Sequence, residues 1–203
     1  MKKLVIFDLD GTLLNTIADL AHSTNYALNK LGYPTHEIEK YNFMVGNGID
    51  KLFERALPEG EKSKENVLRV HKEFVPYYDI HNADDSRPYP GIPELLSYLQ
   101  DAGIQIAVAS NKYQAATQKL IDHYFPEIHF TAVFGQREGI KVKPDPTVVF
   151  DILEVAKVTK EEVLYVGDSG VDMQTAANAG VTACGVTWGF RPRAELEEFS
   201  PQY

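Results

Sequence analysis

The feature that most constrains the fold of this chain is a series of short apolar runs that end in small or polar residues. The first run, Leu4–Phe7, stops at an acidic pair, Asp8 and Asp10. A continuous apolar run of this length is typical of a strand that is buried on both faces of a parallel sheet. Four later runs have the same character: Ile104–Ser110, Ala132–Gly135, Val163–Asp168 and Thr182–Val186.

Segments with helical spacing lie between these runs, and prolines and glycines mark several of their ends. Strands that alternate with helices predict an α/β fold: a doubly wound, Rossmann-like parallel sheet with helices on both faces. The predicted helices are Ile92–Ala102, Tyr113–Tyr124, Pro146–Ala156 and Val171–Ala179.

One long interval breaks the alternation. Residues 14–85 are charged, contain no comparable apolar run, and show helical spacing of their apolar residues, as at Leu20, Ala27 and Leu28. We expect this interval to form a helical cap inserted into a core made of residues 1–13 and 86–203. The polar, turn-forming segment His81–Pro88 is the predicted hinge at its far end.

Composition restricts the class of protein. The chain has 203 residues, of which 44% are hydrophobic and 24% charged, as in an ordinary globular protein. Its net charge of −9 argues against broad contact with nucleic acid or anionic membranes. The single cysteine, Cys184, is expected to be a buried packing residue. No signal peptide or membrane span is expected, so we predict a cytoplasmic protein. We also expect a monomer or weak homodimer. The expected partner is a small molecule.

Acidic residues are expected to gather at one edge of the sheet, because ligands of open parallel sheets bind beyond the carboxyl ends of the strands. Asp8 and Asp10 are two residues apart and leave a regular strand on the same face, so their charges repel. Asp168 and Asp172 follow a later strand. This concentration of carboxylates predicts a site for Mg²⁺, which prefers oxygen ligands.

A phosphoryl group is the natural partner of Mg²⁺, and the same strand ends carry groups that could bind one. A lysine, hydroxyls and free N–H groups are all available there. An Asp carboxylate can attack phosphorus to form an aspartyl-phosphate, and a neighbouring Asp can carry the proton for both half-reactions. The polar residues at these strand ends are Thr12, Ser110 and Asn111, and Lys143 precedes a proline that could begin a helix.

These residues resemble the haloacid dehalogenase superfamily, in which Asp-x-Asp-x-Thr is followed by a strand-end Ser or Thr, a Lys before proline, and a late Gly-Asp-x-x-x-Asp. The resemblance implies that Asp8 is the nucleophile and a Mg²⁺ ligand. It implies that Asp10 is the acid/base and gives its backbone carbonyl to the metal. It further implies that Ser110 and Lys143 bind the transferring phosphoryl group and that Asp168 completes the metal site with support from Asp172. The candidate phosphate-binding residues also include Gly11, Thr12 and Asn111, which would orient or contact phosphate.

The resemblance extends to the substrate. Val45–Ile49 and Gly185–Phe190 look like the glycine-rich stretches of phosphoglycolate phosphatases, so Gly46, Asn47 and Gly48 are the candidate specificity residues of the cap. A tight turn without ligand contact is the alternative, and glycine suits both because its backbone can approach a ligand closely. Lys51 and Arg55, which follow this stretch, could attract a substrate carboxylate but are expected to be solvated.

Several other functions remain open at this stage. Nucleotides, sugar phosphates or pyrophosphate could replace phosphoglycolate as substrate. A β-phosphoglucomutase-like phosphotransferase is disfavoured by Ile49, which stands where that branch commonly carries Arg. A receiver-type phosphoacceptor domain uses similar residues, but it has no helical insert. A catalytically inactive binding protein would be expected to lose a motif residue, and none is lost here.

Overall fold

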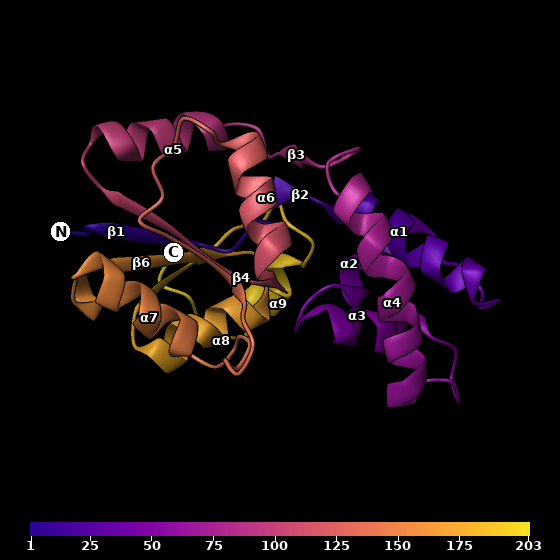
Figure 1. The fold of residues 1–203 in the computed structure, drawn as a ribbon. Coiled ribbons are helices and arrows are strands. Elements are labelled where there is room, and N and C mark those ends of the chain that lie inside the picture. Colours follow the sequence, from indigo (N-terminus) through magenta and orange to yellow (C-terminus); the bar gives the residue numbers. More distant parts are fainter.

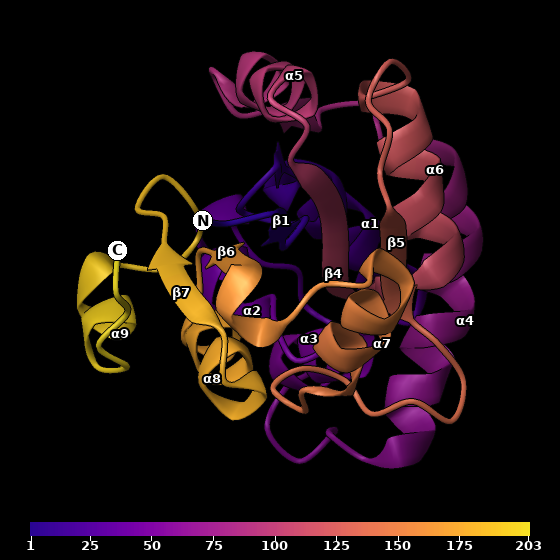
Figure 2. The ribbon, with the colours of Figure 1, turned by 90° about the vertical axis from the view of Figure 1, so that its left-hand side faces the viewer.

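The computed structural model describes all 203 residues, and its centre is a sheet of five parallel strands (Figures 1 and 2). The strand order is β5-β4-β1-β6-β7. The strands are β1 Leu4–Phe7, β4 Gln105–Tyr113, β5 Ala132–Gln136, β6 Val163–Gly167 and β7 Thr182–Gly185. The predicted doubly wound parallel sheet is therefore confirmed.

Strand β1 lies in the middle of the sheet, and its side chains alternate between two hydrophobic layers. Leu4 and Ile6 pack with apolar side chains of α7 and α8, whereas Val5 and Phe7 pack with those of α5 and α6. Helices thus cover both faces. Their bounds are α5 Ile92–Asp101, α6 Gln114–Tyr124, α7 Thr147–Ala156 and α8 Gly170–Ala179, with the shorter α9 Arg193–Glu197 and a 3₁₀ turn Lys160–Glu162 nearby.

Strand β4 differs from the sequence-based expectation. The apolar run predicts an end at Ser110, but the strand continues to Tyr113, with irregular register against β5 between Ala109 and Tyr113. Polar residues can occupy this extension because it borders a pocket at the edge of the sheet rather than a packed helix layer. Hydrophobicity alone therefore placed the strand end too early.

A second group of helices, drawn in indigo to magenta in Figure 1, stands beside the carboxyl ends of the strands. These helices share a hydrophobic cluster of their own, in which Leu28, Phe53, Phe74 and Tyr78 are fully buried. We call this group the helical part. It consists of α1 Ile17–Lys30, a 3₁₀ turn Ile38–Lys40, α2 Tyr41–Met44, α3 Ile49–Ala56 and α4 Lys64–His81.

The chain crosses between the sheet and the helical part at a small antiparallel ribbon of β2 (Leu14–Asn15) and β3 (Arg87–Pro88). Beside this ribbon, the buried carboxylate of Asp19 accepts hydrogen bonds from the backbone N–H groups of Asp85 and Ser86, at 2.9 and 2.8 Å, and from the Ser86 hydroxyl, at 2.6 Å. The two chain segments that connect the sheet to the helical part are therefore held together beside this ribbon.

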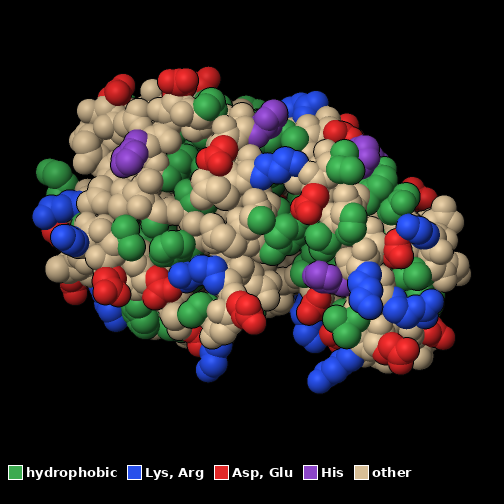
Figure 3. All heavy atoms as spheres, in the orientation of Figure 1, with side chains coloured by type: hydrophobic (Ala, Val, Ile, Leu, Met, Phe, Trp, Pro, Cys, Tyr) green, Lys and Arg blue, Asp and Glu red, His purple; other side chains and the backbone are tan.

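The surface is mixed in character. Figure 3 shows acidic and basic side chains interspersed over one face of the sheet region and the helical part, without a large area of one sign. None of the helices combines the length and apolar character that a bilayer crossing requires.

Candidate active site

The candidate site lies where the carboxyl ends of the central strands meet the helical part. Phe7 of β1 is in register with Val108 of β4 and Val166 of β6, so the residues that follow these strands emerge together. A pocket of about 730 Å³ opens there. It is lined by Asp8, Asp10, the Ser110–Tyr113 end of β4, and Lys143 from the sheet side, and by apolar and glycine residues of the helical part.

Asp8 presents one occupied and one free carboxylate oxygen. Its Oδ1 accepts a hydrogen bond from the N–H of Leu9 at 2.7 Å and lies 2.9 Å from Nζ of Lys143. Its Oδ2 has no partner within the protein. The side chain is fixed through one oxygen, and the other is available to a metal ion or an electrophile.

Asp168 follows β6 and is held from two directions. Its Oδ1 accepts from the buried hydroxyl of Thr12 at 3.1 Å, and its Oδ2 accepts from the N–H of Phe190 at 2.8 Å. Gly11 and Gly189 flank the carboxyl group so closely that a Cβ at either position would overlap it. Gly11 also has φ +87°, which glycine adopts without strain. The structure thus brings Gly11 and Thr12 against Asp168.

Asp172 is fully buried at the start of α8, and both of its oxygens are occupied. Oδ1 lies 2.7 Å from Nζ of Lys143 and 3.3 Å from the Tyr165 hydroxyl, while Oδ2 accepts from the hydroxyl and N–H of Ser169. Asp172 caps the helix and anchors Lys143. Lys143 therefore bridges two carboxylates, those of Asp8 and Asp172.

The electrostatics of the site favour a cation. Burial, and then the charge of Asp172, raise the pKa of Asp8 well above its usual value, although Lys143 opposes this shift. The same two causes raise the pKa of Asp168 to about 7. Each carboxylate is harder to ionise than in water because it is buried and faces the charge of Asp172.

The residues present fit Mg²⁺. Carboxylate oxygens of Asp8, Asp168 and Asp172 lie within 4.8 Å of one another. When ionised, three carboxylates against the single ammonium of Lys143 leave two uncompensated negative charges, which a divalent cation matches. Of the three, only Asp8 has a carboxylate oxygen without a protein partner, because both oxygens of Asp168 and both oxygens of Asp172 accept hydrogen bonds.

Asp10 belongs to a separate network on the side of the helical part. Its Oδ1 accepts from the hydroxyl of Thr16 at 2.6 Å and lies 3.1 Å from Nζ of Lys112, and its Oδ2 has no protein partner. Lys112 is buried and also donates to the Tyr78 hydroxyl at 2.8 Å. Burial lowers the pKa of Lys112, but the Asp10 carboxylate and Tyr78 more than offset this and keep it above its usual value.

The adjacent residues Ser110 and Asn111 of β4 lie in different surroundings. Ser110 is buried, lines the pocket, and accepts a hydrogen bond from the N–H of Lys112 at 3.1 Å, which leaves its own hydroxyl hydrogen for a ligand. Asn111 is bound to the backbone of Lys143, donating to its C=O at 3.0 Å and accepting from its N–H at 2.8 Å. Asn111 thereby fixes the segment that carries the lysine.

Gly46, Asn47 and Gly48 line the pocket from the helical part, and all three have positive φ angles, of 114°, 62° and 90°. We call residues 45–48 the glycine loop. Arg55 donates to the carbonyls of Met44 and Gly46 and to Oδ1 of Asn47, at 2.7 to 2.9 Å.

The solvated position expected for Arg55 is therefore wrong, because its guanidinium is hydrogen-bonded to the carbonyls of Met44 and Gly46. Lys51, in contrast, is exposed and pairs with Glu54.

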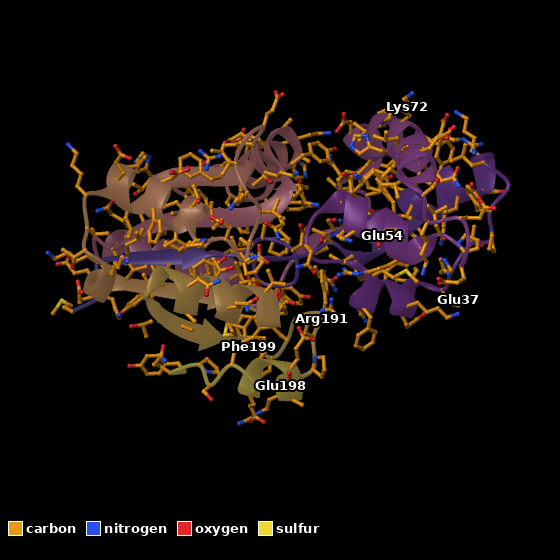
Figure 4. The ribbon with its side chains drawn as sticks, turned by 90° about the horizontal axis from the view of Figure 1, so that it is seen from below. Glu37, Glu54, Lys72, Arg191, Glu198 and Phe199 are labelled. Carbon is orange, nitrogen blue, oxygen red and sulfur yellow. The ribbon has the colours of Figure 1, made fainter.

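Arg191 reaches the same loop from the sheet side and donates to the carbonyl of Val45 at 2.9 Å. Figure 4 shows it between the C-terminal segment and the helical part. Its neighbour Phe190 donates to Asp168, so adjacent residues contact the acidic cluster and the glycine loop.

Sequence reasoning did not single out Lys112 or Arg191. A signal for Lys112 existed, since residues two apart on a strand share a face and Ser110 was already a candidate. It was lost because the strand was expected to end at Ser110. No comparable signal marks Arg191.

Several known proteins resemble this chain over nearly its full length. The profile of the family "haloacid dehalogenase-like hydrolase" matches residues 5–186. The phosphoglycolate phosphatase of Mesorhizobium japonicum is 33% identical over 98% of this chain and 88% of its own length, and that of Agrobacterium fabrum is 34% identical over 97% and 86%. A crystal structure described as a predicted phosphoglycolate phosphatase from Haemophilus somnus superposes with a TM-score of 0.91 at 29% identity, covering 100% of this chain and 92% of the other. The chain belongs to the haloacid dehalogenase-like hydrolase family, within its phosphatase branch.

Proposed function

We propose that this protein hydrolyses a small phosphate monoester in a Mg²⁺-dependent reaction that passes through an aspartyl-phosphate on Asp8. The observation that carries the proposal is the unpaired Oδ2 of Asp8 beside Lys143 at the pocket floor. A carboxylate held through one oxygen, with the other free, has the form that a nucleophile requires. Phosphoglycolate is the proposed substrate, because proteins of that name are similar to this chain over nearly its full length.

The first half-reaction forms one bond and breaks another. Oδ2 of Asp8 attacks phosphorus, and the P–O bond to the leaving group breaks. The ammonium of Lys143 and the hydroxyl of Ser110 are the proposed contacts of the transferring phosphoryl oxygens. Asp10 in its protonated form donates a proton to the departing oxygen.

In the second half-reaction Asp10, now a carboxylate, takes a proton from water, and the water oxygen attacks phosphorus. The bond between phosphorus and Asp8 breaks, and inorganic phosphate leaves. Bound Mg²⁺ supplies charge neutralisation, which lets an anionic carboxylate approach an anionic ester. Asp8 and Asp168, with the backbone carbonyl of Asp10, are the proposed ligands, supported by Asp172.

We further propose that residues 14–85 act as a cap that selects the leaving group. Three observations support this role: the helical part has its own hydrophobic cluster, the chain enters and leaves it at one ribbon, and its glycine loop borders the pocket.

Steady-state kinetics on a panel of phosphate esters test the function. The panel contains phosphoglycolate, a nucleoside monophosphate, a hexose phosphate, β-glucose 1-phosphate and pyrophosphate, each assayed with Mg²⁺ and after chelation by EDTA. We expect Mg²⁺-dependent turnover with the highest kcat/KM for phosphoglycolate. Asp8→Asn should abolish it, whereas Asp122→Asn, an exposed change on α6, should not. Wild-type rates in Asp8→Asn would refute the assigned nucleophile.

A further inference from the structure

Lys112 is a buried cation that lies beside Asp10 but makes no contact with the phosphoryl group in the steps proposed above. Its side chain is only 4% exposed, yet it borders the pocket. An ammonium has three N–H donors. One faces Asp10, a second is bound to the Tyr78 hydroxyl, and a third is left for a ligand. The hydrogen of the Tyr78 hydroxyl also has no acceptor within the protein.

The other two cations that line the pocket have other partners, and Lys143 is already the proposed contact of the phosphoryl group. Lys143 lies between Asp8 and Asp172, and Arg191 donates to the Val45 carbonyl. Lys51 is exposed and paired outside the pocket.

Part of the pocket wall is apolar and includes Leu20, Leu52 and Phe74, and the ring of Phe74 stacks on that of Tyr78. Such a wall cannot solvate an anion, so a negatively charged leaving group needs a cation at this place.

The position of Lys112 also fixes how far such a charge can lie from the reacting bond. Under the proposed function, Asp10 protonates the bridging oxygen of the ester, so that oxygen must lie beside Asp10. Lys112 contacts the same carboxylate. In phosphoglycolate only one carbon separates the bridging oxygen from the carboxylate group. A charge this close to the oxygen falls within reach of a lysine that touches Asp10.

We propose that Lys112 and Tyr78 form a subsite for a carboxylate on the carbon next to the ester oxygen of the leaving group. Lys112 contributes a charge-assisted hydrogen bond, and Tyr78 contributes a neutral one. The inference rests on the proposed function and narrows it to short phosphooxy-carboxylates. It assigns recognition of the substrate carboxylate to Lys112 of β4 and Tyr78 of α4, rather than to Lys51.

The test compares selectivity rather than activity, because Lys112→Met also removes the cation beside Asp10 and lowers all rates. For each protein, kcat/KM is measured for phosphoglycolate and for ethyl phosphate, which lacks the carboxylate, with Mg²⁺ present. We expect Lys112→Met to reduce the ratio of the two values by about tenfold to a hundredfold. Tyr78→Phe, which conserves shape and leaves Asp10 paired, should reduce it by about threefold to tenfold. Lys51→Met is the matched control and should leave the ratio unchanged.

The possible results distinguish failure of the subsite from failure of the proposed phosphatase function. A wild-type ratio retained in both Lys112→Met and Tyr78→Phe overturns the subsite and leaves the phosphatase intact. A wild-type enzyme that hydrolyses esters without preferring phosphoglycolate to ethyl phosphate also overturns it. Failure to hydrolyse any ester overturns the proposed function and the subsite together. If Lys112→Met does not fold, the Tyr78→Phe ratio decides.

Discussion

Replacing Asp168 by asparagine should make the metal-free protein more stable at alkaline pH, although it removes a proposed metal ligand. Asp168 is 2% exposed, and burial together with Asp172 raises its pKa to about 7, from 3.8 for an ordinary Asp. Without a cation, folding must therefore hold this carboxylate in a place where its charge is unfavourable. Asparagine keeps the shape and removes the charge.

The magnitude follows from proton linkage. The folded-state pKa lies above the unfolded value, so the folded protein binds more protons between about pH 4 and pH 7, and its stability falls as pH rises through that range. A difference of roughly 3 pKa units corresponds to a total of about 4 kcal/mol. About 2 kcal/mol of this should be lost between about pH 5.5 and pH 8. Asp8, whose pKa is also raised, acts in the same direction.

Urea denaturation in EDTA at these two pH values provides the assay. The unfolding free energy of the wild type should fall by about 2 kcal/mol or more towards the higher pH, and that of Asp168→Asn should fall by less. Adding Mg²⁺ at about pH 8 should restore stability to the wild type but give little to the variant. Asp122→Asn, exposed on α6, should behave as the wild type. A wild type whose stability does not fall with pH in EDTA would refute the reasoning.

Three further predictions concern the surroundings of the site. Gly11→Ala should reduce the unfolding free energy by about 1–3 kcal/mol more than Gly32→Ala, because both glycines have positive φ but only the Gly11 Cβ meets a carboxyl group; equal losses in urea denaturation would contradict this. Arg191→Ala should speed amide exchange in residues 45–48 by about fivefold, because the hydrogen bond to the Val45 carbonyl is lost. Arg193→Ala, a surface change, should leave that exchange rate unaltered. An unchanged exchange rate in Arg191→Ala would show that this hydrogen bond does not hold the glycine loop. Chelation by EDTA should abolish turnover and Mg²⁺ should restore it, and full activity in EDTA would contradict the metal requirement.

Much of the fold could be predicted because a buried parallel strand has a simple pattern. Leu4–Phe7 is apolar at every position and is fully enclosed between two helix layers. The polar residues after such strands must converge, since parallel strands share an edge. Asp8, Asp168 and Asp172 were found in this way, and they lie within 4.8 Å of one another.

The contacts made by those residues could not be predicted, because they depend on packing between distant segments. The pattern suggested that Asn111 orients or contacts phosphate, and the structure places its amide on the backbone of Lys143. Arg55 was expected to be solvated but binds the glycine loop. Lys112 was overlooked since a polar strand extension has no hydrophobic signature.

The central claim is that Asp8 carries the phosphoryl group between the two half-reactions. The most direct measurement is to quench the enzyme with acid during turnover of ³²P-labelled phosphoglycolate, reduce it with borohydride, and map the modified peptide by mass spectrometry. We expect ³²P on the acid-quenched protein and, on reduction, release of that phosphate together with conversion of residue 8 to homoserine. Neither should occur in Asp8→Asn. Label on another residue, or turnover at the wild-type rate with no phosphoenzyme at any quench time, would contradict it.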